Sequence, residues 1–327
     1  GNTVIAKPAE QTPLTAFRAV QLFQEAGLPD DVLHLLPGDG EMIGAALTEE
    51  PGIAGVCFTG STQVAKAINR ALAAKDGPIP VLIAETGGLN GMFVDTTALR
   101  EQVMDDVVMS AFNAAGQRCS ALRILFVPDE TADMLIEGLE GAMDALVIGD
   151  PRNAGTDVGP VIDEEARGVI AAHIETARAE GRLLHELRTP NSGTFIAPTL
   201  IKVGSIKDMG REIFGPVLHL ATFKSNEIDA LIDTINGTGY GLTFGLQTRI
   251  DDRVQHISER IHAGIHLCPC PLFLAPYQRQ TVPQPPRIAG QVIGKVRHTG
   301  CRRGDTTFRI RVWGGPIVHF TRSRTDM

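Results

Sequence analysis

The sequence predicts an α/β fold in which helices cover a largely parallel β-sheet. Short apolar runs of strand length alternate with longer segments of helical apolar spacing along most of the chain. Turns rich in Gly and Pro separate these segments. The total of 327 residues leaves room for about two domains with hydrophobic cores. Alternating strands and helices are typical of parallel sheets, because each helix returns the chain to the same end of the sheet.

Residues 1–86 contain the first strand–helix repeats and form the first expected domain. Thr12 and Pro13 make a good N-cap and first-position pair for a helix, and Gly27 supplies its end. The expected strands are residues 4–6, 32–36, 55–58 and 81–84, and the expected helices are residues 14–26, 42–47 and 63–74.

Residues 87–264 continue the same alternation and form the second expected domain. The expected helices are residues 99–114, 131–143 and 164–179, and the expected strands are residues 121–127, 195–200 and 221–223. This domain is therefore also expected to have the α/β architecture.

Charge and cysteine content narrow the class of protein. The formal net charge is −8, but residues 265–327 carry ten Lys/Arg against two Asp, so the rest of the chain is about −16. An acidic body argues against nucleic acid as the main partner. No apolar run is long enough for a membrane span. Five cysteines without regular spacing do not form a disulfide framework, so we expect a reducing compartment, the cytoplasm.

The segment Phe58-Thr59-Gly60-Ser61 joins an expected strand to an expected helix. Unpaired N–H groups at a helix start suit a phosphate. The G-x-G-x-x-G fingerprint of ordinary dinucleotide-binding folds is absent. A plain helix cap at Ser61 is the alternative that the residues themselves leave open.

Two residues have the types and positions needed for covalent catalysis. Glu85 follows an expected strand and precedes two glycines, where open α/β sheets bind ligands. Cys119 lies between an expected helix and the apolar run 121–127. A thiol nucleophile and a carboxylate base are the parts required to form and hydrolyse an acyl intermediate. Taken singly, Glu85 could be a solvated turn residue and Cys119 a small buried hydrophobe.

Five motifs in order give the chain a resemblance to the aldehyde dehydrogenase superfamily. They are KPAEQTP (7–13), FTGST (58–62), ETGG (85–88), GQRC (116–119) and EIFGP (212–216). Residues 84–90 and 117–123 are most similar to the glutamate γ-semialdehyde (pyrroline-5-carboxylate) dehydrogenase module of bifunctional proline-utilisation proteins. The resemblance covers about residues 1–264. It implies a partial Rossmann-type cofactor domain in residues 1–86 and an α/β catalytic domain in residues 87–264.

The resemblance also implies a role for each matching residue. Cys119 would attack the aldehyde and carry the thiohemiacetal and thioester, and Glu85 would activate the water that releases glutamate. The cofactor would be NAD, since the charge of Glu10 at the adenosine ribose disfavours NADP. Its implied contacts are Lys7, Glu10, Phe58, Thr59, Gly60, Ser61, Glu212 and Phe214. Ser120 would hold the substrate carboxylate, and Phe112 would line the aldehyde channel or pack in the core.

Parts of the family pattern are missing from the sequence. The chain starts inside an apparent strand without Met, so we expect that it begins partway into a larger protein. The resemblance implies that this parent protein is fused to proline dehydrogenase and is oligomeric. The first strands of the cofactor domain and the family's oxyanion asparagine would lie upstream. Two alternatives follow: an enzyme for another small aldehyde, or an inactive fragment with exposed sheet edges.

The basic tail, residues 265–327, departs from the family. We expect an out-of-frame reading or an unrelated fusion, because likeness stops near residue 264 and the charge reverses. Cys268, Cys270, His298 and Cys301 lack paired zinc-ligand spacing. The other histidines also lack ligand spacing, so no metal is expected and each is interpreted as a surface or hydrogen-bonded residue: His173, His185, His219 and His256.

Overall fold

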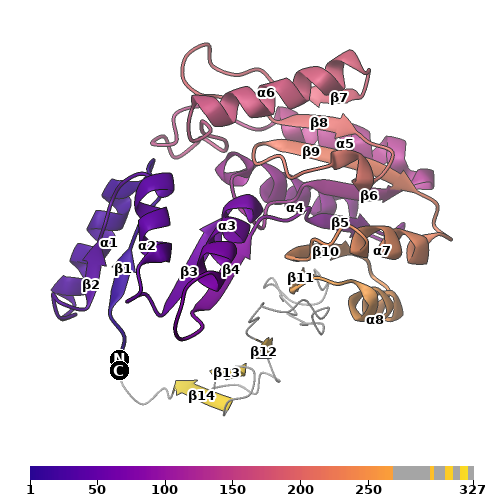
Figure 1. Cartoon of the computed structure of the whole chain (residues 1–327). Helices are drawn as coiled ribbons and strands as arrows, with labels where there is room; N and C mark the ends of the chain where they lie inside the picture. Colours follow the sequence, from indigo (N-terminus) through magenta and orange to yellow (C-terminus); the bar gives the residue numbers. More distant parts are fainter. Residues whose placement is uncertain (268–294, 298–305, 312–316, 323–327) are drawn as a thin grey trace. The chain divides into compact units, whose positions relative to one another are not determined.

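The computed structural model describes residues 1–267, 295–297, 306–311 and 317–322. The chain divides into two compact units, Gly1–Thr86 and Gly87–Met327. In Figure 1 the first unit runs from indigo to purple, and the second from purple through orange to yellow.

The first unit contains two parallel pairs of strands, each connected through helices. Helix α1 packs on strand β2, and α3 packs on β3 and β4. The elements in order are β1 (Val4–Ala6), α1 (Pro13–Glu25), β2 (Leu33–Leu35), η1 (Gly40–Gly44), α2 (Ala45–Glu49), β3 (Gly55–Gly60), α3 (Thr62–Ala73) and β4 (Val81–Thr86). The alternation predicted for this segment is therefore confirmed.

The strands β3 and β4 are longer than expected. In the parallel ladder Thr59 is paired with Glu85, and Gly60 with Thr86. Thr59 and Gly60, which were expected in a turn, are therefore the last residues of β3. Glu85 and Thr86, which were expected to follow a strand, are the last residues of β4. Ser61 is the single residue between β3 and α3. Its side chain accepts a hydrogen bond from Val64 N at 3.2 Å and so caps the start of the helix.

The first unit has a small core among the described residues. Ala65 and Leu72 of α3 are buried, whereas the side chains of α1 are not: Leu14 is 81% exposed and Phe17 is 52% exposed. The two-stranded sheets leave their outer edges unpaired within the described part of the chain. Exposed edges of this kind are the feature expected of a fragment.

The second unit is built on a seven-stranded sheet with the order β11-β10-β5-β6-β9-β8-β7. All neighbouring strands are parallel except β7, which runs antiparallel to β8. Its strands are β5 (Gly91–Val94), β6 (Ile124–Pro128), β7 (Leu183–Glu186), β8 (Thr199–Lys202), β9 (Val217–Phe223), β10 (Thr243–Gln247) and β11 (Ile265–Leu267). Its helices are α4 (Arg100–Phe112), η2 (Asn113–Gly116), η3 (Asp129–Thr131), α5 (Ala132–Asp144), α6 (Glu164–Ala179), η4 (Ile206–Met209), α7 (Ile228–Asn236) and α8 (Asp251–Arg260).

Apolar patterning explains the core of the second unit. Strands β5 and β6 are buried along their whole lengths, as central strands of a parallel sheet must be. Helix α5 buries Leu135, Leu139 and Met143, whose spacing places them on one face. Helix α6 packs on β7 and β8, and Figure 1 shows it at that end of the sheet.

The helix expected at residues 99–114 ends earlier, at Phe112. Ala114, Ala115 and Gly116 then adopt left-handed backbone conformations with φ of 53°, 52° and 65°. This turn reverses the chain before the cysteine, and the next strand begins only at Ile124 rather than at residue 121. Left-handed alanine is strained, so the turn needs support from surrounding contacts.

The sheet continues past residue 264, because β11 pairs in parallel with β10. In the tail, β12 (Lys295–Arg297), β13 (Thr306–Arg311) and β14 (Ile317–Arg322) form an antiparallel sheet. The residues considered for zinc, Cys268, Cys270, His298 and Cys301, lie outside the described residues. Within the described part of the chain, the helices are too short or too polar to cross a membrane.

Candidate active site

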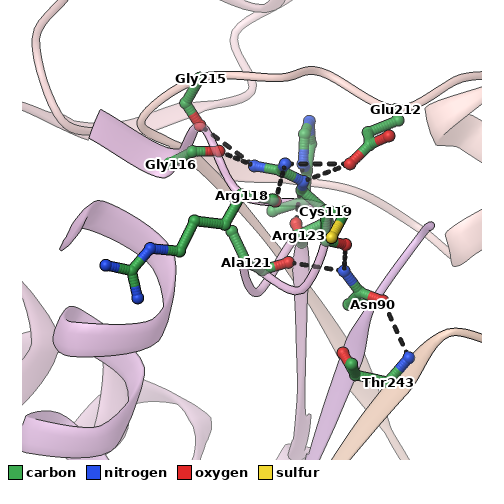
Figure 2. Close-up of polar contacts among 10 residues, drawn as sticks. Asn90, Gly116, Arg118, Cys119, Ala121, Arg123, Glu212, Gly215 and Thr243 are labelled. Atoms are coloured by element: carbon green, nitrogen blue, oxygen red, sulfur yellow. Dashed lines mark hydrogen bonds and ion pairs between the residues drawn. The ribbon is translucent and has the colours of Figure 1, made fainter. Parts of the chain in front are cut away.

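Cys119 lies on the loop between η2 and β6, as the free thiol of an exposed residue. The loop returns toward the sheet at Ala121, whose N–H donates to the carbonyl of Arg118 at 3.0 Å. A ligand can therefore reach a thiol that sits on a turn with defined hydrogen bonds. Figure 2 shows the cysteine with its immediate polar surroundings.

Asn90 holds the loop from the sheet side. The residue is 3% exposed, and its side-chain nitrogen donates to the carbonyl oxygens of Cys119 at 2.6 Å and Ala121 at 2.9 Å. Its side-chain oxygen accepts from the backbone N–H of Thr243 at 3.1 Å. One buried amide thus connects the cysteine loop to β10, as Figure 2 shows.

Arg123 holds the loop from the opposite side, next to the Glu212 loop. Its side chain is 0% exposed. The guanidinium donates to the carbonyls of Gly116 at 2.6 Å and Arg118 at 2.9 Å, both just before Cys119. It also bonds to Oε1 of Glu212 through Nε at 3.1 Å and Nη2 at 2.9 Å. The loop that carries the thiol and the loop that carries Glu212 therefore share one buried cation.

Glu212 is the counter-charge of Arg123. Its side chain is 15% exposed. Burial raises the pKa of Glu212, while the charge of Arg123 and a hydrogen bond from Gly88 N–H lower it. A Cβ on Gly87 would lie 1.7 Å from Oε2 of Glu212, so glycine is required there for the carboxylate to approach the backbone. Phe214, 44% exposed, lies with its ring centroid 5.0 Å from the guanidinium carbon of Arg123.

Gln117 connects the left-handed turn to a neighbouring loop. Its side-chain oxygen accepts from Ile162 N at 2.8 Å, and its side-chain nitrogen donates to the carbonyl of Ala114 at 3.3 Å. With the Arg123 bond to Gly116, these contacts provide the support that the strained turn requires.

In the first unit, Lys7 and Glu10 lie side by side. The Lys7 ammonium donates to the carbonyl of Gly38 at 3.0 Å and lies 3.6 Å from the Glu10 carboxylate. Glu10 accepts from Gly40 N–H. Hydrogen bonds from its own backbone N–H and from Gly40 lower the pKa of Glu10, so it is a carboxylate at neutral pH.

This pair suits the ribose of a dinucleotide. It lies beyond the carboxyl ends of β1 and β2, two parallel strands, which is the usual ligand position in open α/β sheets. A cationic donor beside an anionic acceptor matches two neighbouring hydroxyl groups. The donor and acceptor that Lys7 and Glu10 provide therefore fit the ribose of a nicotinamide dinucleotide.

The remaining predicted residues of the first unit lie at the ends of β3 and β4. Phe58 and Thr59 are strand residues, Gly60 ends β3, and Ser61 caps α3. Glu85 is an exposed residue near the end of β4, paired with Thr59. Both strands are parallel, so these residues gather at one edge of the pair.

The two predicted substrate residues have different environments. Ser120 is exposed and follows Cys119 directly. Phe112 is 0% exposed and belongs to the core cluster at the end of α4. Of its two expected roles, packing in the core is the one that fits this position.

The structure reveals two site residues to which the sequence reasoning gave no role, Arg123 and Asn90. Arg123 lies beside an apolar strand and was interpreted as part of an apolar run. The signal that could have found it is the charge itself, since a buried arginine needs a carboxylate partner. Asn90 follows the two glycines of the Glu85 motif, where a polar side chain commonly looks like an ordinary turn residue.

Behind the loop, the buried His219 is paired with the half-buried His173. His219 is 1% exposed, and its Nδ1 lies 3.0 Å from the carbonyl oxygen of Arg123. Its Nε2 lies 2.9 Å from Nε2 of His173 on α6. Both rings are hydrogen-bonded, one of the two environments expected for these histidines. Burial, opposed in part by the bond to Arg123, lowers the pKa of His219 to about 4. Burial and the charges of Arg182 and Arg211 also lower the pKa of His173.

The pair predicts a loss of stability in acid. Because the pKa of His219 is about 4 in the folded chain, against about 6.5 for an ordinary histidine, the unfolded chain binds the proton more tightly. The stabilisation is complete above pH 6.5 and is lost as the pH falls toward 4, by up to about 3 kcal/mol. Urea unfolding from pH 7 to pH 4 measures it.

The control for this prediction is His219→Asn, whose amide can still donate to the Arg123 carbonyl without titrating. The variant should show a smaller decrease in unfolding free energy between pH 6.5 and 4, while the exposed His34→Asn should behave as the wild type. Equal pH dependence in His219→Asn and wild type would exclude the His219–His173 pair as the origin of the acid destabilisation.

Comparison with known proteins gives one family and many relatives. The model of the aldehyde dehydrogenase family matches residues 1–275, so the family likeness extends further than residue 264, where the sequence motifs led us to expect its end. The bifunctional protein PutA of Escherichia coli K12 is 49% identical over 276 residues, covering 81% of this chain and 21% of that protein. A 1-pyrroline-5-carboxylate dehydrogenase of Bacillus subtilis 168 is 36% identical over 270 residues, covering 81% of this chain and 52% of that protein.

Solved structures show the same relationship. A crystal structure of a bifunctional proline utilization A protein superposes with a TM-score of 0.80 at 53% identity, covering 82% of this chain and 27% of that one. A 1-pyrroline-5-carboxylate dehydrogenase from Thermus with bound NAD gives a TM-score of 0.76 at 34% identity, covering 82% and 52%. The chain thus spans about a fifth of the length of the bifunctional relatives and about half that of the single-function dehydrogenases.

Proposed function

The chain belongs to the aldehyde dehydrogenase family, and from that premise we propose that it takes part in the NAD-dependent oxidation of L-glutamate γ-semialdehyde to glutamate, a step of proline catabolism. The observation that carries the proposal is the exposed thiol of Cys119 on a loop fixed by Asn90 and by the buried Arg123–Glu212 pair. Similarity to PutA and to 1-pyrroline-5-carboxylate dehydrogenases supports this substrate among aldehydes.

The reaction begins with the addition of the Cys119 thiolate to the aldehyde carbon, which gives a thiohemiacetal. NAD would supply the acceptor for the hydride that leaves this carbon. The residues proposed to contact it are Lys7 and Glu10 of the first unit and, separately, Glu212 and Phe214 of the second. The carbon is then bonded to Cys119 as a thioester. Glu85 takes a proton from water, the water oxygen attacks the thioester carbon, and the carbon–sulfur bond breaks. Glutamate leaves, the Cys119 thiolate is restored, and Glu85 releases its proton to solvent.

The described contacts explain why Cys119 suits this role. A nucleophile must be accessible and also held in a constant orientation, because misplacement by about 1 Å can lower a rate by about 10². Exposure of the residue gives access, and the bonds from Asn90 and Arg123 to the flanking carbonyls restrict the loop. Ser120 follows as the residue proposed to bind the substrate carboxylate.

We further propose NAD as the cofactor, a fused and oligomeric parent protein, and the cytoplasm as the compartment. The Glu10 carboxylate at the ribose site favours NAD over NADP, because a 2′-phosphate would meet a like charge. The bifunctional name of the PutA relatives supports a parent protein fused to proline dehydrogenase, which we propose is oligomeric. The free thiols of Cys57 and Cys119 suit a reducing compartment, the cytoplasm.

Two alternatives make different predictions. An enzyme for another small aldehyde keeps the chemistry of Cys119 and changes only what Ser120 contacts. An inactive fragment keeps the fold, and the unpaired edges and small core of the first unit favour it. In that case the activity belongs to a longer chain with the same site.

The test is NADH formation by the 327-residue chain with glutamate γ-semialdehyde, compared with acetaldehyde and with succinate semialdehyde. We expect kcat/KM to be highest for glutamate γ-semialdehyde by about 10²-fold. Equal or higher values for another aldehyde would replace the substrate. No NADH with any aldehyde, together with no rise in melting temperature on adding NAD, would establish the inactive fragment.

A further inference from the structure

We propose that Arg123 is a positioning residue that couples the Cys119 loop to Glu212, so that the reactivity of the thiol depends on this ion pair. The inference rests on the proposed function only for the catalytic role of Cys119. Arg123 itself is completely buried and is not expected to touch the substrate.

All the hydrogen-bonding capacity of the guanidinium is directed at two loops. A guanidinium has five N–H donors. Three contacts go to backbone carbonyls, those of Gly116 at 2.6 Å, Arg118 at 2.9 Å and Gly215 at 3.4 Å. Two go to Oε1 of Glu212. Figure 2 shows the guanidinium between the Gly116 and Gly215 carbonyls and the Glu212 carboxylate.

The position of these contacts along the chain makes the arrangement specific to the thiol. Gly116 and Arg118 are the third and first residues before Cys119, and the turn that contains Gly116 is left-handed. Arg123 thus fixes the backbone just before Cys119, while Asn90 fixes the carbonyls of Cys119 and Ala121. Without the guanidinium, the carbonyls of Gly116 and Arg118 lose their bonds to it, while the bonds of Asn90 and those of Gln117 remain.

Charge connects the same three residues. Burial lowers the pKa of Arg123, whereas the Glu212 carboxylate and, to a smaller extent, the charge at Cys119 raise it. The guanidinium is thus a buried cation that is paired with Glu212 and also acts electrostatically on Cys119. A cation of this kind stabilises a nearby thiolate, which is the reactive form of cysteine. The negative charge of Glu212 offsets the positive charge of Arg123. Neutralising Glu212 should therefore increase the net positive potential that Arg123 exerts at the thiol.

The planar shape of the Arg123 guanidinium contributes to holding the loop, in addition to its charge. Lysine would keep the charge but has one nitrogen, which cannot bridge the Gly116 carbonyl, the Arg118 carbonyl and Glu212 in the planar arrangement of arginine. Methionine has a similar length and neither property. Comparing Arg123→Lys with Arg123→Met therefore separates the loss of charge from the loss of geometry.

The experiment is alkylation of the 327-residue chain by iodoacetamide, in which a thiolate displaces iodide, followed by peptide mass spectrometry. The rate at Cys119 is divided by the rate at Cys57, an exposed free cysteine of the first unit, in the same sample. This internal reference cancels reagent and concentration effects. Leu139→Ala creates a cavity beside α5 and is the matched control. It lowers the stability of the chain without changing a residue of the Cys119 loop.

We expect the Cys119 to Cys57 ratio to fall about tenfold in Arg123→Met and less in Arg123→Lys. In Glu212→Gln, whose amide oxygen can still accept from Arg123, the ratio should rise. Leu139→Ala should lower the melting temperature and leave the ratio unchanged. A ratio within twofold of wild type in the Arg123 variants, or a fall in Glu212→Gln, would overturn the proposal.

The alkylation experiment gives an answer even if one variant fails to fold. If Arg123→Met does not fold, the same criteria apply to Arg123→Lys and Glu212→Gln, which keep a charge or an acceptor in place. No aldehyde or dinucleotide is present, so failure of this test is distinct from failure of the proposed function. A changed ratio in a chain that forms no NADH would support the coupling and reject the activity.

Discussion

Replacing Cys119 with alanine is expected to lower kcat/KM for NADH formation by at least about 10³-fold, because the variant has no atom that can form the thiohemiacetal. The side chain is exposed, so the change leaves no buried cavity and the melting temperature should stay close to that of wild type. Steady-state kinetics with glutamate γ-semialdehyde and NAD measure the effect.

The matched control is Cys57→Ala, which removes the other free cysteine of the described residues. We expect its rate to lie within about twofold of wild type, as for a surface substitution without a chemical role. If Cys119→Ala retained the wild-type rate, or if Cys57→Ala lost it, Cys119 would not be the nucleophile.

Gly116→Ala is expected to reduce the free energy of unfolding by about 3 kcal/mol or more. An added Cβ would lie 2.1 Å from the Gly215 carbonyl oxygen and 2.9 Å from that of Ala111, both backbone atoms. The φ of 65° is also unfavourable for any residue with a Cβ. Relief of these clashes must move the backbone that leads to Cys119, so alkylation of the thiol should change too.

Gly141→Ala provides the comparison for Gly116→Ala. Gly141 lies inside α5, and an added Cβ there would meet nothing within 4 Å. Alanine in such a position should stabilise the chain by about 0.5–1 kcal/mol. Urea unfolding of both variants measures the difference, and a Gly116→Ala chain as stable as wild type would show that the turn is not constrained as described.

Much of the fold could be predicted from apolar periodicity. Helix α6 has the predicted bounds because Asp163 caps its start through Ala166 N, a local signal. The early end of α4 could not be predicted in this way. Ala114 and Ala115 favour helix intrinsically, and their left-handed conformation is supported by the side-chain bonds of Arg123 to Gly116 and of Gln117 to Ala114 and to the distant Ile162.

The candidate site was predicted in part, for a related reason. Cys119 and Glu212 stand out because their motifs contain turn glycines and unusual polar residues. The sequence predicted two possible roles for Phe112, lining the aldehyde channel or packing in the core. The sequence pattern is the same in both cases, and only the structure shows that the side chain is buried. Arg123 and Asn90 act through contacts with residues up to 153 positions away, which no local pattern encodes.

The most direct test of the account is to trap the acyl group. In Glu85→Gln the base that releases the product is removed, so the chain mixed with glutamate γ-semialdehyde and NAD should form about one NADH per chain and then slow sharply. After an acid quench, peptide mapping should find the acyl group as a thioester on Cys119 alone. An acyl group on another residue, NADH without any adduct, or neither product would contradict the assignment of Cys119 as the nucleophile of aldehyde oxidation in this chain.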